Sequence, residues 1–201
     1  MQTLHPFRGA IQEYLQEFSD ADRYRPKPCP LCHAAHPLRA HGFYSRTLVD
    51  VNYDGAIPVR RYLCLLCKRT VSLLPEFALP YLRFSVQVIG LFLVARLLHT
   101  CTLAKAAKTA FQLKMPYQRG QFWVRRFKKQ AEALCAALSS LKPAMRASDF
   151  LTRALQMLEA IGWIAAHRFL FSELRTHLLG WPRFLIPHGL RVNMSPVPSS
   201  S

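Results

Sequence analysis

The chain has 201 residues, 51% of them hydrophobic, which suits one ordinary domain or two small ones. Its formal net charge is +16, and residues 85–142 hold ten Lys or Arg but a single acid, Glu132. The most apolar stretch, 86–98, is shorter than the roughly 20 apolar residues of a membrane span, and no secretory signal precedes it. We therefore expect a cytoplasmic, nucleoid-associated protein that is not bound to a membrane and whose partner is anionic. The alternative is a basic protein whose charge serves only to keep it soluble.

The N-terminal part is predicted to hold one helix and a β-hairpin. Apolar residues at three- and four-residue spacing predict a helix over 7–18. Residues 42–53 and 56–63 are rich in Val, Ile, Tyr and Thr and flank Asp54-Gly55, a common turn pair, which predicts antiparallel strands. The two prolines of 73–85 favour an extended connector.

Two Cys-x-x-Cys pairs, Cys29 with Cys32 and Cys64 with Cys67, lie at the ends of this predicted hairpin. Two such turns aim four thiolates at one point, and Zn²⁺ takes four sulfur ligands in a tetrahedron with Zn–S of about 2.3 Å. Four cysteines leave no open coordination position for catalysis. We predict one structural Zn²⁺ in a zinc ribbon.

Other interpretations of the cysteines remain open. Reduced thiols disfavour a disulfide frame, and a redox pair needs a βαβ setting that the sequence does not predict. His33, His36 and His41 are near enough to replace a ligand, but the four cysteines make that unnecessary. Cys101 and Cys135 have no partner motif and are expected in the core.

From residue 85 onward the pattern is helical. Periodicity and breaks predict helices at 85–99, 102–111, 117–140, 149–165 and 167–179, before a Pro- and Ser-rich end. The segment 102–134 has the layout of a helix-turn-helix. Thr102 suits a helix cap, and Pro116 suits the start of the following helix. Leu103, Ala106, Ala107 and Ala110 would form the small buried face of the first helix.

The second of these helices is predicted to read DNA. Its buried stripe would be Trp123, Phe127, Ala131, Leu134 and Leu138. Its N-terminal residues Gln118, Arg119 and Gln121 would contact bases, because Arg and Gln make bidentate contacts to guanine and adenine. The expected phosphate contacts are Arg125, Arg126, Lys128 and Lys129, with Lys105 and Lys108 on the preceding helix. The alternative is the solvated face of an ordinary core helix.

The predicted fold class is α+β, a small antiparallel zinc ribbon followed by a mainly α helix-turn-helix region. The predicted parts are an N-terminal helix (1–24), the zinc ribbon (25–84), the helix-turn-helix region (85–142), a helical C-terminal segment (143–185) and a disordered tail (186–201).

Residues 25–135 resemble the N-terminal zinc-ribbon and helix-turn-helix region of bacterial insertion-sequence transposases. The resemblance rests on the two cysteine pairs, on "HGFYSR" (41–46) and on "RYLCLLCKRT" (61–70), with "TLAKAAKTAF" (102–111) and "FWVRRF" (122–127) behind them. It implies that this region binds the ends of a mobile element as double-stranded DNA.

The chain departs from that family after residue 142. A full transposase of this kind carries three metal-binding carboxylates on an RNase H-like fold, whereas this chain has only Asp149, Glu159 and Glu173, on predicted helices. We therefore expect no enzyme, but a DNA-binding protein associated with transposition. It would either serve a separate transposase catalytic subunit or be the remnant of a truncated element. The alternatives are a transcription regulator, an RNA-binding zinc-ribbon protein, and a docking protein that uses residues 149–179.

Overall fold

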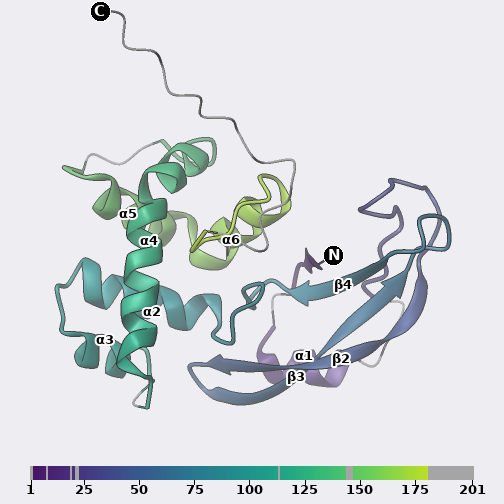
Figure 1. The fold of residues 1–201 in the computed structure, drawn as a ribbon, viewed down its shortest axis with the longest axis horizontal. Coiled ribbons are helices and arrows are strands. Elements are labelled where there is room, and N and C mark those ends of the chain that lie inside the picture. The colour runs from purple at the N-terminus through teal and green to yellow at the C-terminus, as the bar shows by residue number, and fades with distance from the viewer. Residues whose placement is uncertain are drawn as a thin grey trace, which may run out of the picture.

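The computed structural model of the chain describes residues 2–7, 9–18, 20, 23–112, 114–143 and 147–180. These residues form a mixed α+β fold with a four-stranded sheet and six helices. The sheet takes one side of the molecule and α2 to α6 gather on the other (Figure 1). In chain order the elements are β1 (Gln2–His5), α1 (Ile11–Glu17), β2 (Arg39–Asp50), β3 (Tyr53–Leu63), β4 (Thr70–Pro75), α2 (Val86–Leu97), α3 (Leu103–Thr109), α4 (Tyr117–Leu138), α5 (Phe150–Ile161) and α6 (Trp163–Ser172).

The predicted hairpin exists, but its turn is not at Asp54-Gly55. The strands β2 and β3 turn at residues 51–52, and Asp54-Gly55 lies inside β3. A Cβ at Gly55 would lie 2.8 Å from the hydroxyl of Tyr53, so the Tyr53 side chain would have to shift to accept one. Asp54 accepts an ion pair of 2.8 Å from Arg83 on the connector. The register of β2 with β3 therefore does not follow the local turn preference of this pair.

The sheet is also not purely antiparallel, because β1 pairs in parallel with β4 in the order β1-β4-β3-β2. The expected connector 73–85 therefore begins as a strand. Pro75 is tolerated because β4 pairs with β3 only as far as Leu73, so the missing amide hydrogen of Pro75 falls beyond that ladder.

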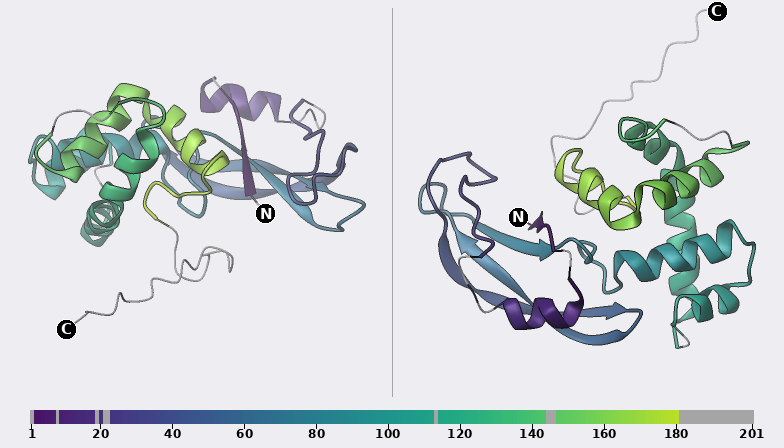
Figure 2. Two further views of the ribbon diagram at one scale, coloured as in Figure 1. Left: turned by 90° about the horizontal axis from the view of Figure 1, so that it is seen from above. Right: turned by 180° about the vertical axis from the view of Figure 1, so that it is seen from behind.

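The two faces of the sheet are buried by different parts of the chain. Helix α1, shorter than the predicted 7–18, lies over one face (Figure 2) and packs Ile11 and Tyr14 against Leu48, Ile57 and Val59. A second cluster, at the end of the sheet that carries the cysteines, contains Cys29, Leu38, Tyr62, Cys64, Val71 and Leu73. The sheet is thus buried by one cluster around α1 and by another at its cysteine end.

The helical half packs around α2 and α4. Helix α2 buries most of its circumference, and the 22-residue α4 buries one face. The predicted helix 149–165 is wrong in its extent: it is broken at Gly162, whose φ of 93° is costly for any other residue, so that α5 and α6 are separate helices. In the part of the chain that the structure describes, no helix is both long and apolar enough to cross a membrane. The predicted tail, 186–201, lies outside the described residues.

Polar contacts join the two halves. The partly buried guanidinium of Arg46 on β2 donates to the carbonyls of Leu79 and Leu82, and its partial burial lowers its pKa. Nε of Arg168 on α6 lies 2.7 Å from the carboxylate of Glu76, of which only 2% is exposed. These contacts fix the sheet against the helices through the segment 76–82.

Candidate metal centre and nucleic-acid interface

The two cysteine loops have the same backbone design. The amide of Cys29 donates to the carbonyl of Ala34 at 3.1 Å, and the amide of Cys64 donates to the carbonyl of Arg69 at 3.0 Å. In both loops the hydrogen bond spans five residues and closes the Cys-x-x-Cys turn. Each loop therefore presents its two thiols to the same side, as the spacing predicts.

The four thiols converge. The sulfur atoms of Cys29, Cys32, Cys64 and Cys67 all lie within 4.8 Å of one another, and these four cysteines could hold a metal ion. Cys29 and Cys67 are 3.9 Å apart, and Cys32 and Cys64 are 3.7 Å apart. A tetrahedron with Zn–S bonds of about 2.3 Å has S···S edges of about 3.8 Å, so the spacing fits that geometry.

The second loop also stabilises a thiolate at Cys64. Backbone amides, that of Cys67 first, hold the pKa of Cys64 down to about 6 although burial acts in the opposite direction. The Cys67 amide lies 3.5 Å from the Cys64 sulfur, and the Leu31 amide 3.4 Å from the Cys29 sulfur. A metal ligand must be the thiolate, so amide donors at the sulfur favour metal binding.

Among the nearby histidines, His36 lies closest to the sulfur cluster. Its Nε2 is 3.5 Å from the sulfur of Cys64, and its Nδ1 contacts the carbonyl of Pro37. His33 and His41 are exposed. The group that could hold a metal ion consists of the four cysteines alone.

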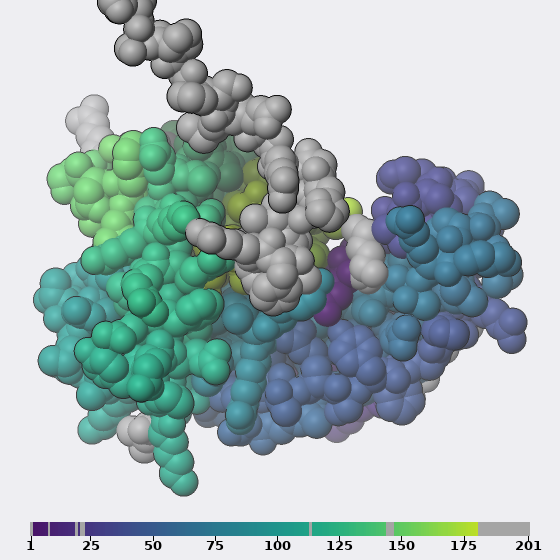
Figure 3. All heavy atoms as spheres, in the orientation of Figure 1, coloured from purple at the N-terminus to yellow at the C-terminus, as the bar shows by residue number. Residues whose placement is uncertain are grey.

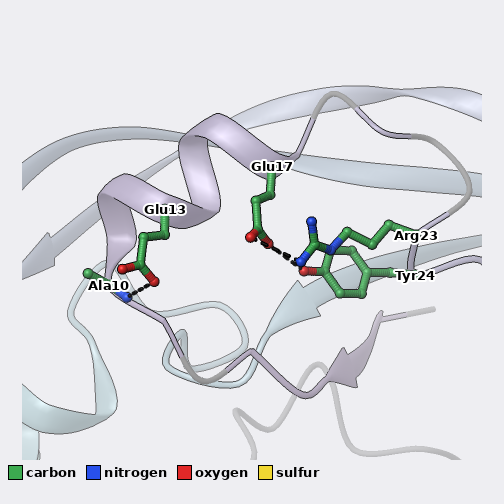
Figure 4. Close-up of polar contacts among 5 residues, drawn as sticks. All are labelled: Ala10, Glu13, Glu17, Arg23 and Tyr24. Carbon is green, nitrogen blue, oxygen red and sulfur yellow. Dashed lines mark hydrogen bonds and ion pairs between the residues drawn. The ribbon is translucent and has the colours of Figure 1, made fainter.

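Helix α1 holds the segment that leads into the first cysteine loop. Glu17 at its end accepts a hydrogen bond from the hydroxyl of Tyr24 at 3.0 Å and an ion pair from Arg23 at 3.0 Å (Figure 4). Glu13 fixes the start of the helix by accepting from the amide of Ala10 at 3.1 Å. The chain therefore approaches Cys29 from an anchored position beside the sheet.

The second candidate site is the pair α3 and α4. Thr102 caps α3 as predicted, because its side chain accepts from the amide of Lys105 at 3.2 Å. The small face of α3 is buried at Ala106, Ala107 and Ala110, and Leu103 is partly buried. Lys105 and Lys108 project to solvent from the other side.

The buried stripe predicted for α4 is confirmed. Trp123, Phe127, Ala131, Leu134 and Leu138 are all buried. The Trp123 ring meets Phe84 and Phe92 edge-on, with centroids 4.9 and 5.2 Å apart. This stripe fixes the rotation of α4 and so decides which side chains face water.

The opposite face of α4 is polar and basic. Gln118, Arg125, Lys128 and Lys129 are exposed, and Gln121 is partly exposed. Helix α4 forms the front of the helical half (Figure 3), on the opposite side of the molecule from the cysteine loops (Figure 1). Within the described residues, none of these three basic side chains forms an ion pair.

Arg126 and Arg119 lie apart from that face. Nε of Arg126 donates to the carbonyl of Leu179 at 2.8 Å, and a second guanidinium nitrogen donates to the carbonyl of Gly180. Arg119 is exposed, and its guanidinium carbon lies 6.0 Å from the Phe84 ring centroid. Helix geometry gives the reason, since at about 100° per residue both positions fall within about 60° of Trp123.

Sequence reasoning missed three exposed aromatic side chains in this region. Phe111, Tyr117 and Phe122 are 63%, 61% and 38% exposed. Phe111 follows the C-cap of α3 and has a φ of 58°, and Tyr117 begins α4. These aromatic residues lie among basic residues and not in a regular apolar stripe. This pattern could have identified them as exposed side chains.

Comparison with known proteins gives one family match. A family model described as "Domain of unknown function (DUF6431)" matches residues 29–111. No curated protein and no solved structure matches the chain. The matched segment begins at Cys29, contains all four cysteines with α2 and α3, and stops before α4.

Proposed function

We propose that the protein binds double-stranded DNA through α3 and α4, used as a helix-turn-helix, while one structural Zn²⁺ holds the cysteine loops as a zinc ribbon. The proposed role is recognition of the ends of a mobile element in transposition. In this role the chain is not an enzyme by itself and serves a separate catalytic subunit.

The observation that carries this proposal is the division of α4 into two faces. One face is buried, and the other presents Gln118, Gln121, Arg125, Lys128 and Lys129. The start of such a helix enters the major groove, where glutamine can pair with adenine, and basic residues farther along meet phosphates. We leave Arg126 out of the proposed surface because its guanidinium is engaged with carbonyls.

Helix α3 supports the same geometry. Lys108 of α3 and Tyr117 of α4 line the same cavity, so α3 lies beside the first turn of α4. Lys105 and Lys108 are exposed there and would neutralise phosphates that flank the groove. Only one acid, Glu132, lies among the ten basic residues of 85–142.

The choice of zinc follows from the donor set. Four thiolates at tetrahedral spacing suit Zn²⁺, which is not redox-active and has no preferred geometry of its own. A site closed by four sulfurs has no position for water or substrate, so the metal would stabilise structure.

The acids after residue 142 support an accessory role. Asp149 caps α5, accepting from the amide of Thr152 at 2.9 Å and from its hydroxyl at 2.8 Å, and these bonds lower its pKa. Glu159 and Glu173 are exposed. Two-metal phosphoryl transfer needs carboxylates held together at a rigid site.

The test is DNA binding by the zinc-loaded protein, measured by fluorescence anisotropy at several salt concentrations. The triple variant Arg125→Gln, Lys128→Gln, Lys129→Gln should weaken binding to every sequence and reduce the salt slope by about 0.9 for each phosphate that is no longer neutralised. The control is Lys142→Gln, an exposed lysine beyond α4. Absence of salt-dependent binding, or equally weakened binding in the triple and control variants, would refute the proposal.

Selection of bound DNA from a random pool tests the predicted readout. A defined motif should be enriched, and Gln118→Ala or Gln121→Ala should change the preferred bases more than the affinity for non-specific DNA. An unchanged motif in both variants would remove these residues from base contact.

A further inference from the structure

A cavity opens beside the proposed DNA-binding face, between α3 and the start of α4. Its volume is about 340 Å³. Leu103, Ala104 and Ala107 of α3 and Met115 of the connection line it with apolar surface, while Lys108 and Tyr117 provide its polar groups. The size is near the lower end of the range of about 300–1,000 Å³ for small-molecule pockets.

Small residues create this space. Ala104 and Ala107 lie on the α3 side of the cavity, and Gly120 lies on the α4 side. Gly120 brings α4 close to the core, because a Cβ there would lie 2.7 Å from Phe92. Helix α4 therefore packs closely on α2 at Gly120, and the small residues of α3 leave the cavity open beside this contact.

Aromatic and cationic side chains occur together around this opening. Tyr117, 61% exposed, lines the cavity, and Phe111 is exposed in the connection between the helices. Lys108 lines the same cavity, and Lys114 is exposed in the connection. Proteins that bind unpaired nucleotides use this combination, because aromatic rings stack on bases and lysines neutralise the adjacent phosphates.

We propose that this cavity takes one unpaired base of the bound DNA. The protein would then prefer duplex DNA with an extruded base to fully paired duplex. The proposal rests on the DNA-binding function proposed above and adds the class of DNA structure that the site selects.

The charge around the cavity favours a nucleic acid over an apolar peptide as its occupant. Residues 85–142 carry ten basic groups and one acid, and the cavity lies within this segment. A paired base cannot enter, since its neighbours in the stack cover both of its faces, whereas an extruded base exposes them. The apolar walls and Tyr117 would replace the stacking that the base loses.

The test compares three short labelled duplexes at low salt, where sequence-independent contacts dominate binding. One is fully paired, one carries a single extra thymine, and one carries an abasic nucleotide in place of that thymine. The abasic duplex keeps the backbone distortion but lacks the base. We expect about tenfold tighter binding of the thymine-bulge duplex than of either other duplex.

Two variants locate the effect. Ala104→Leu fills the cavity from an exposed helical position and should abolish the preference while leaving affinity for paired DNA unchanged. Tyr117→Ala should reduce the preference by removing the stacking ring. The control Ala136→Leu, at an exposed position far along α4, should keep the preference, and circular dichroism melting confirms that each variant is folded.

The outcomes separate the two proposals. Equal binding of all three duplexes, or equal binding of the thymine and abasic bulges, would overturn the base-binding cavity and leave the DNA-binding proposal standing. A preference that survives in Ala104→Leu would also overturn it. Failure to bind any of the duplexes would refute both proposals.

Discussion

His33 and Lys68 occupy equivalent places in the two cysteine loops: each follows the second cysteine of its pair, and their φ angles are 57° and 54°. The left-handed region costs a residue with a Cβ about 1–2 kcal/mol, and glycine avoids this cost. We expect Lys68→Gly to raise the free energy of unfolding by about 0.5–1 kcal/mol, measured in urea with zinc present. Leu66→Gly, nearby but without a positive φ, should give no gain.

Metal content tests the cysteine centre directly. The purified protein should hold about one zinc ion per chain, and Cys32→Ser or Cys64→Ser should lose it because three thiolates cannot complete the tetrahedron. Cys101→Ser, in the helical half, is the matched control and should keep the metal. Elemental analysis gives the metal content, and a chelator should lower the melting temperature of the parent only. Full occupancy in Cys64→Ser would exclude the assigned centre.

Buried histidines make the fold sensitive to acid. Burial lowers the pKa of His167 to about 3, and that of His5 and His177 to about 4, from the ordinary value of 6.5. The unfolded chain therefore binds protons first, so their contribution to stability is complete above pH about 6.5 and is lost as the pH falls toward 4 and 3. Each histidine contributes a slope of up to about 1.4 kcal/mol per pH unit in this window.

The variant His167→Phe tests this pH dependence. Urea unfolding at several pH values gives the slope of the unfolding free energy against pH. In His167→Phe this slope should fall by about the contribution of one histidine, because the phenylalanine ring takes up no proton. The variant His99→Gln, at an exposed position, should leave the slope unchanged. Identical slopes in His167→Phe and the parent would show that His167 does not couple folding to protons.

The close approach of α2 and α4 depends on Gly120. In Gly120→Ala the new Cβ would lie 2.7 Å from Phe92 and 3.4 Å from Leu103, which forces the helices apart. We expect a decrease of about 1–3 kcal/mol in stability, although alanine favours a helix over glycine by about 1 kcal/mol. Thermal unfolding measures the decrease. The exposed control Ala136→Gly should cost only the helix propensity, and a stabilised Gly120→Ala would contradict the packing.

Neighbouring arginines on α4 should have different roles. Arg125→Gln should weaken DNA binding with little change in stability, since Arg125 is exposed. Arg126→Gln should lower stability by about 1.5–3 kcal/mol, because it removes charged hydrogen bonds to Leu179 and Gly180. Anisotropy measures DNA binding and urea unfolding measures stability in both variants. Loss of stability in Arg125→Gln with weakened DNA binding but unchanged stability in Arg126→Gln would contradict this assignment.

Features that depend on local periodicity were predictable from the sequence. The buried stripe of α4 follows from helical spacing alone, and the convergence of the four cysteines follows from two turns of equal length. The separation of Arg126 from Arg125 was also accessible, because the same helical geometry turns Arg126 toward the Trp123 side.

Features that depend on distant partners were not predictable. The four residues of β1 show no alternation long enough to indicate a strand, and their partner is β4. Asp54-Gly55 lies inside β3 despite its turn preference, paired with Val49 and Leu48, and Asp54 forms an ion pair with the distant Arg83. The cavity between α3 and α4 depends on the crossing of two helices, which no single helical pattern specifies.

The pairing of β1 with β4 also orders events during synthesis. Gln2 pairs with Ser72, 70 positions later, so β1 leaves the ribosome long before its partner exists. The β2–β3 hairpin can form in the meantime from contacts close in sequence. The strand that is translated first therefore cannot join the sheet before β4 has been made.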